Sequence, residues 1–294
     1  MIPVHRTPVI VWKDYLDASR SLLLWAVIGA LTLLVAILYF VIFWVGSDPT
    51  ALDIIGPASA LMQLIVPLLG LIIGYRSIVS ERKSGSIKVL LSLPPSRAEV
   101  VFGKFIGRSL VLATAIAASF LMFLILSIIL FQEVLLVDFV SLAVATAIVG
   151  FAFVGIAVGV SALVNTRGQA MAGVIGLYFV FLLLWDLITA GIHRVVMGEL
   201  PDGPFGQYEA WYVFLQWLNP IEAFSVISDT LLDESFGAFT IPLFAPQEIS
   251  NTEQIVIGDV PWYLSEPMAV VILLAWAVIP VAIGWYRFDR VDLG

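Results

Sequence analysis

The chain has 294 residues, of which 61% are hydrophobic and only 12% are charged, and its formal net charge is -8. A soluble domain usually carries about a quarter charged residues, so this composition excludes a water-soluble domain and indicates a membrane protein. The absence of cysteine excludes disulfides, iron–sulfur clusters and thiolate zinc sites. The basic residues form no stripe on one folded face, which excludes nucleic acid as a partner.

The first predicted element is an amphipathic helix over 8–20. Such a helix directly before an apolar run is typical of a segment that lies in the membrane interface. The apolar run that follows, 22–45, is longer than the core of a signal peptide, so we interpret it as an uncleaved first span. One side of the helix would hold Val9, Trp12, Tyr15, Leu16 and Ser19, and the other side Lys13, Asp14, Asp17 and Arg20.

Six apolar stretches are long enough to cross about 30 Å of hydrocarbon at about 1.5 Å per residue. The predicted fold is therefore an all-α integral membrane protein, with six transmembrane helices in a single domain over 1–294. The predicted spans are 22–45, 56–79, 106–131, 138–164, 170–191 and 267–286.

The basic residues predict how the spans are oriented. Six spans place thirteen of the fourteen Lys and Arg residues on one face. The positive-inside rule makes this face cytoplasmic, with both termini on it and the protein in the cell membrane.

The last outer segment, 192–266, holds eleven acidic residues and a single basic one, Arg194. It is too long for a simple connector. Its apolar residues recur at helical spacing, which predicts one or two short amphipathic helices at the outer interface, broken at Asn219-Pro220. Loop or short strand is expected over 236–264.

The motifs of enzymes are absent from the chain. No phosphate-binding loop is present, because Gly103-Lys104 is followed by Phe105 and lacks the earlier glycine. The two histidines, His5 and His193, lie on opposite predicted faces and cannot form a metal or catalytic cluster. We therefore predict no catalytic residue, no cofactor and no metal in this chain.

Asp186 is the one carboxylate inside a predicted span. A charge in hydrocarbon is costly, so this side chain is expected to face protein or water. Two interpretations stay open, a structural hydrogen-bonding role and a place in the substrate path.

Glycine pairs four residues apart permit close helix packing, within the chain or across a dimer. They occur at Gly70/Gly74, Gly103/Gly107 and Gly155/Gly159.

The segment between spans two and three carries the most functional information. A charged cluster from Ser80 to Lys83 is followed by Gly85, an apolar stripe and Pro94-Pro95. The chain restarts at Ser96 with Glu99 three residues later, which is a capping box. This pattern predicts two short helices joined by a proline turn on the cytoplasmic face. Apolar residues in a cytosolic connector indicate a docking surface; they are Ile87, Leu90, Leu91 and Leu93.

These residues resemble the loop motif of ABC-2 family ABC transporter permeases, especially the NosY-like branch. The amphipathic leader, the six spans and the Asn219-Pro220 pair resemble the family too. The loop motif is matched by Glu81, Arg82, Gly85, Leu90, Leu91, Leu93, Pro94, Ser96, Arg97, Gly103 and Lys104, and the closing tail by Arg287, Phe288, Arg290, Asp292 and Leu293.

The resemblance implies a type-2 ABC exporter-like permease fold, in which this subunit forms the substrate path. It also implies a dimer of separate ABC ATPase subunits that bind the ATP, and a second permease subunit in a homodimer or heterodimer. Segment 80–104 would be the coupling loop, and export the direction. The implied ATPase-coupling residues are Glu81, Arg82, Gly85, Leu90, Leu91, Pro94, Ser96, Arg97, Gly103 and Lys104, with Asp186 as the candidate for the substrate path.

Two other functions are compatible with six spans. One is a secondary transporter, which the shortage of buried charges and of an inverted repeat disfavours. The other is a membrane assembly factor that transports nothing, in which segment 192–266 would be the working part.

Overall fold

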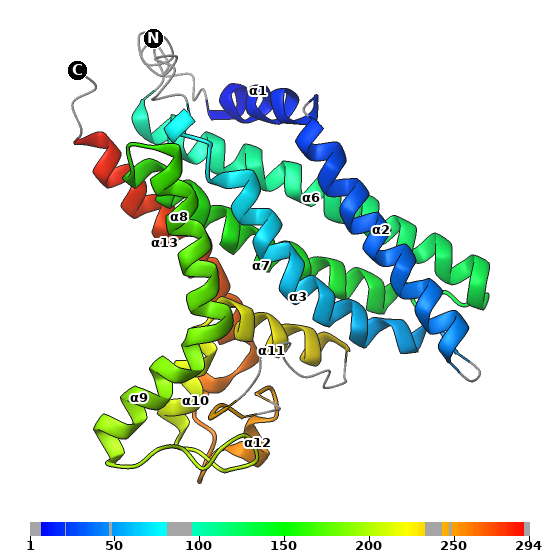
Figure 1. Cartoon of the computed structure of the whole chain (residues 1–294), viewed down its shortest axis with the longest axis vertical. Helices are drawn as coiled ribbons and strands as arrows, with labels where there is room; N and C mark the ends of the chain where they lie inside the picture. The colour runs from blue at the N-terminus through cyan, green and yellow to red at the C-terminus, as the bar shows by residue number, and fades with distance from the viewer. Residues whose placement is uncertain are drawn as a thin grey trace.

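The computed structural model describes residues 7–20, 22–46, 49–80, 96–232, 243–246 and 249–290, and most of them are helical (Figure 1). Within these ranges, six helical stretches are long and apolar enough to cross a membrane, which confirms the predicted all-α membrane fold. They are α2 (Leu22–Val45), α3 (Leu52–Gly74), α6 (Arg97–Phe131), α7 (Leu136–Leu163), the stretch from α8 (Arg167–Phe179) to α9 (Trp185–Met197), and α13 (Glu266–Asp289).

The N-terminal helix α1 (Thr7–Ser19) precedes α2 and packs against α6 (Figure 1). Val9 and Trp12 are exposed, as expected for the apolar side of an interfacial helix. Asp14 departs from the sequence-based expectation, because it was assigned to the water-facing side and is only 7% exposed. The reason is that α1 turns this carboxylate onto α6, where two basic side chains neutralise it.

The central helix of the bundle is α7, which contacts α3, α6, α13 and α11 (Pro220–Leu232). Glycines bring its neighbours close. A Cβ at Gly74 of α3 would lie 2.6 Å from the Cβ of Ala157, and a Cβ at Gly159 of α7 would overlap the backbone of Pro280 in α13. The glycine pairs of α3 and α7 therefore serve packing within one chain.

Two short helices lie within the predicted outer segment, α10 (Ala210–Trp217) and α11 (Pro220–Leu232). The chain breaks between them at Asn219, as predicted, and the Asn219 side chain accepts a hydrogen bond from the Ile221 N–H over 3.0 Å. The expected amphipathic character is wrong for α11, because α11 packs against α7 and α13 and buries its polar residues as well. Glu222 is 6% exposed and Asp229 is 7% exposed.

The rest of the outer segment contains short helical turns. Among the described residues of 243–265 these are α12 (Thr252–Ile255) and the 3-10 turn η2 (Trp262–Leu264), and an isolated bridge pairs Tyr208 with Val256. The sequence predicted loop or short strand over 236–264, and this is wrong for Thr252–Ile255 and Trp262–Leu264, which form helical turns.

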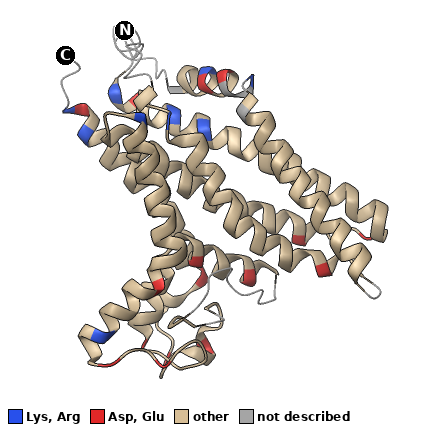
Figure 2. Cartoon of the chain, in the orientation of Figure 1, with Lys and Arg blue, Asp and Glu red and all other residues tan. Residues whose placement is uncertain are grey.

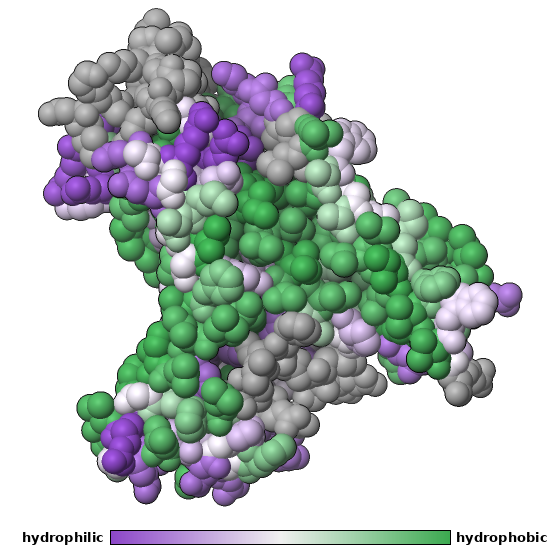
Figure 3. All heavy atoms as spheres, in the orientation of Figure 1, coloured by the Kyte–Doolittle hydropathy of each residue, from purple (hydrophilic) through white to green (hydrophobic). Residues whose placement is uncertain are grey.

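Charge and hydropathy divide the molecule along its length. Lys and Arg gather near α1, the start of α6 and the end of α13 (Figure 2). At the opposite end acidic residues predominate, and a basic position lies on α9. A broad apolar surface lies between the two ends (Figure 3). This pattern is typical of a protein that crosses a bilayer.

Candidate functional site

The predicted coupling residues fall into two groups. Ser96, Arg97, Gly103 and Lys104 lie at the start of α6. The other predicted coupling residues lie outside the described residues; these are Glu81, Arg82, Gly85, Leu90, Leu91 and Pro94. The predicted first short helix before the proline turn lies outside them too.

The predicted capping box is present at the start of α6. The backbone N–H of Glu99 donates to Ser96 Oγ over 3.2 Å, and the backbone N–H of Ser96 donates to Glu99 Oε2 over 2.8 Å. The helix does not stop after a short second element, as the sequence had suggested, but continues to Phe131. Lys104 and Arg108 lie within it, and both contact Asp14 of α1.

Arg97 joins the start of α6 to the end of α13. Its Nη1 donates to the carbonyl oxygens of Phe288 and Asp289 over 2.7 and 2.9 Å. These carbonyls belong to the last turn of α13, where helical partners are missing and a cation is favourable. Arg97 thus fixes the end of the predicted coupling segment to the last span.

Lys104 and Arg108 join α6 to α1 through Asp14. Lys104 Nζ lies 3.3 Å from Asp14 Oδ1, and Arg108 Nε lies 2.9 Å from Asp14 Oδ2. A Cβ at Gly107 would lie 3.0 Å from the Cβ of Asp14, so the glycine allows this approach. Lys104 is 4% exposed, and its side chain therefore faces α1.

Ser161 of α7 binds the backbone just before the predicted coupling segment, and no sequence pattern indicated this role. Its Oγ accepts hydrogen bonds from the backbone N–H groups of Ile78 and Val79, both over 3.1 Å. All three residues are fully buried. A serine inside a span usually bonds its own helix, so only the fold identifies the distant partners.

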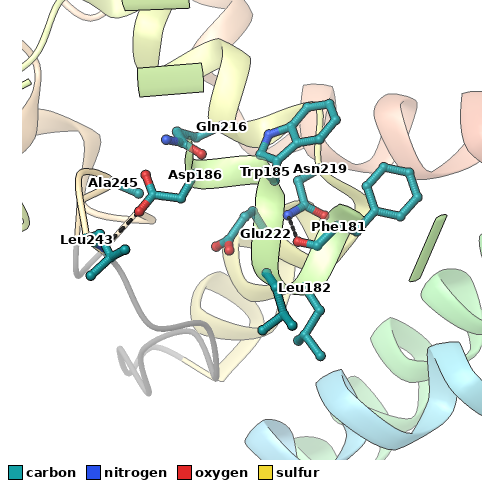
Figure 4. Close-up of a pocket in the computed structure, with 10 residues that line it drawn as sticks. Phe181, Leu182, Trp185, Asp186, Gln216, Asn219, Glu222, Leu243 and Ala245 are labelled. Carbon is teal, nitrogen blue, oxygen red and sulfur yellow. Dashed lines mark hydrogen bonds between the residues drawn. The ribbon is translucent and has the colours of Figure 1, made fainter. Parts of the chain in front are cut away.

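Asp186 lies two residues after a π-helical turn, η1 (Val180–Leu184), in the fifth span. Such turns are often found at functional sites. The Asp186 Oδ2 atom accepts hydrogen bonds from the N–H groups of Leu243 and Phe244 over 2.7 and 2.9 Å. The carboxylate also lines a cavity of about 340 Å³ (Figure 4). Both interpretations of Asp186 therefore remain compatible with its position.

The six helical stretches that could span a membrane, found among the described residues, define the class of polytopic membrane proteins. A family model described as "ABC-2 family transporter protein" matches residues 8–293, and the chain belongs to this family.

Two relatives from bacteria are similar to the chain, and both are described as "Probable ABC transporter permease protein NosY". The one from Pseudomonas aeruginosa is 27% identical over 256 residues, which cover 82% of this chain and 89% of the relative. The one from Stutzerimonas stutzeri is 27% identical over 210 residues, which cover 68% of this chain and 74% of the relative. The chain is the permease subunit of an ABC transporter, and it works with an ATPase partner in a membrane.

Proposed function

We propose that this permease subunit exports its substrate and that segment 80–104 couples it to a dimer of ATPase subunits, which bind the ATP. A second permease subunit, identical or related, completes the path, and no catalytic residue, cofactor or metal resides in this chain. The basic face is cytoplasmic in this proposal, with both termini on it, and the membrane is the cell membrane.

The tethering of both ends of the coupling segment is the observation that supports this proposal. The entry is held to α7 by Ser161, and the exit is held to α13 by Arg97 and to α1 by Lys104. A displacement of the segment would therefore move three other helices of the bundle together. Interfaces that are packed and bistable, rather than deformable, transmit such displacements.

The first test distinguishes the binding of the ATPase from the transmission of its movement to the spans. We expect Glu81→Ala and Leu90→Asp to weaken co-purification with the ATPase, because both residues belong to the docking motif. Arg97→Gln and Ser161→Ala should leave co-purification intact and lower permease-stimulated ATP hydrolysis and transport at least about fivefold, since they only loosen the tethers. Ser265→Ala is the matched control, because that serine makes no side-chain cap. Full stimulation by Arg97→Gln and Ser161→Ala would contradict the proposal.

Asp186 is placed at the outer end of the substrate path in the same proposal. The fifth span carries it to the outer side, and its carboxylate both holds the segment at Leu243 and faces the cavity. Transport assays in inverted and right-side-out vesicles test the direction, with export expected to appear as ATP-dependent uptake into inverted vesicles only.

A further inference from the structure

The cavity beside Asp186 has the dimensions of a small-molecule site. It measures about 340 Å³ and is bounded by the π-helical turn and start of α9, by α10 and α11, and by the segment around Leu243. Small-molecule sites in proteins start at about 300 Å³ and are mostly apolar with a few placed polar groups. Figure 4 shows these walls around Asp186 and Glu222.

The described residues that line the cavity include two carboxylate side chains and no basic side chain. The cavity therefore carries a negative charge. Asp186 and Glu222 reach it from α9 and α11. Asp186 Oδ2 is engaged by two backbone N–H groups, whereas its Oδ1 is buried and has no hydrogen-bond partner among the residues that the structure describes. A buried carboxylate oxygen is unfavourable without a donor or a positive charge, so the cavity favours a ligand that supplies one.

The hydrogen-bond donors on the walls are already used within the protein. Gln216 Nε2 donates to Thr189 Oγ1 over 2.9 Å and to the Tyr212 hydroxyl over 3.1 Å. Trp185 Nε1 donates to the Leu215 carbonyl over 3.1 Å. The polar lining therefore offers mainly acceptors, which suits a donor such as an ammonium group and disfavours an anion.

The remaining walls are aromatic and aliphatic. Phe181, Leu182 and Trp185 stand on the π-helical turn and the start of α9, and Leu243 closes the opposite side. Aromatic faces attract organic cations, and apolar walls hold an apolar body. A bare metal ion fits poorly, because among the residues that the structure describes no group of three or more His, Asp or Glu side chains could hold one.

We propose that this cavity binds an organic cation with an apolar body, of the class of amphiphilic amines, with its positive charge between Asp186 and Glu222. The eleven acidic residues of 192–266, against the single Arg194, would attract such a cation to the outer side. The inference rests on the proposed function only in making the amine a transported substrate, since binding itself needs no ATPase.

The test is a binding measurement on the purified chain in nanodiscs of zwitterionic lipid, without ATPase. The probe is dansylcadaverine, a fluorescent primary amine, and its matched neutral control is the N-acetyl derivative. We expect saturable binding of the amine and at least tenfold weaker binding of the acetylated compound. Asp186→Asn and Glu222→Gln should each weaken binding of the amine about tenfold, whereas Glu253→Gln, a carboxylate outside the cavity, should leave it unchanged.

The variants keep the hydrogen-bonding shape of the site. Asparagine at 186 retains an oxygen for the N–H groups of Leu243 and Phe244, and an unchanged unfolding temperature confirms that the fold is intact. Absence of saturable binding, equal binding of the acetylated compound, or unchanged binding by both folded variants would overturn the inference. Loss of ATPase stimulation by the tether variants concerns the proposed function instead, so the two failures are distinguishable.

Discussion

Three charged side chains meet where α1 crosses α6, and their burial has an energetic consequence. Asp14 lies within 3.3 Å of Lys104 and within 2.9 Å of Arg108. Removing one partner of a buried pair leaves an uncompensated charge, which is more costly than the loss of the contact alone.

We therefore expect Asp14→Ala to lower the free energy of unfolding by about 3 kcal/mol, because Lys104 stays buried without a counter-charge. Thermal unfolding in detergent measures this. Asp17→Ala, on the exposed side of α1, should change the unfolding temperature little. Equal midpoints for the two variants would mean that the cluster does not stabilise the contact between α1 and α6.

The ionisation of Tyr208 makes the stability of the outer segment depend on pH in the alkaline range. Burial, as the largest cause, raises the pKa of its hydroxyl to about 12, from an ordinary value of about 10. The folded state therefore favours the neutral form, and this contribution is fully present below about pH 10 and is lost as the pH rises to about 12.

Protease protection of the outer segment should fall in that pH window. Tyr208→Phe, which has no ionisable hydroxyl, should show a shallower fall, whereas Tyr286→Phe, at a residue that is exposed, should follow the wild type. The comparison is between slopes with pH, because Tyr208 also donates a hydrogen bond to the Gly203 carbonyl. Identical slopes for wild type and Tyr208→Phe would remove the tyrosine from the explanation.

At the scale of the element, glycines decide how closely the spans pack. Gly159→Ala should destabilise the bundle by about 1–3 kcal/mol, because its Cβ would overlap the backbone of Pro280 and force α7 and α13 apart. Gly176→Ala in α8 is the matched control, since a Cβ there meets nothing within 4 Å and alanine favours the helix. In detergent, Gly159→Ala should lower the unfolding temperature and Gly176→Ala should raise it. A similar drop for both variants would count against the packing argument.

Local sequence signals identified some elements better than others. The start of α6 at Ser96 was predictable because both partners of the capping box lie within four residues. The apolar run alone placed the third span from 106, nine residues after the helix begins, because Lys104 precedes the run. Its partner Asp14 is about 90 residues away in the chain, so only the fold shows that this lysine is buried against α1.

In the candidate sites too, features with a local sequence signal were predicted and features that depend on distant partners were missed. Asp186 was singled out because a lone carboxylate in an apolar run is conspicuous. Ser161 was missed, because a serine in a span is common and its partners Ile78 and Val79 lie 83 and 82 residues away. Glu222 was missed as a cavity residue because a carboxylate in an acidic outer segment is unremarkable by sequence.

At the scale of the whole molecule, the separation of charge predicts which end faces the cytoplasm. Because the chain has no cysteine, single cysteines can report exposure without background. Asp202→Cys should react with a membrane-impermeant maleimide in intact cells, and Gly168→Cys only after the cells are opened. The reverse pattern would contradict the assigned orientation and the coupling function with it.

The length of α6 has a mechanical consequence. Its 35 residues extend about 52 Å at 1.5 Å per residue, about 20 Å more than the hydrocarbon thickness. The part from Arg97 to Arg108 would then project from the bilayer as a lever arm, and a swing of about 10° would carry its tip about 3 Å. Asp14 ties α1 to this part of α6, and an interfacial helix lies in the plane of the headgroups. A swing of the arm would therefore carry α1 with it along the membrane surface.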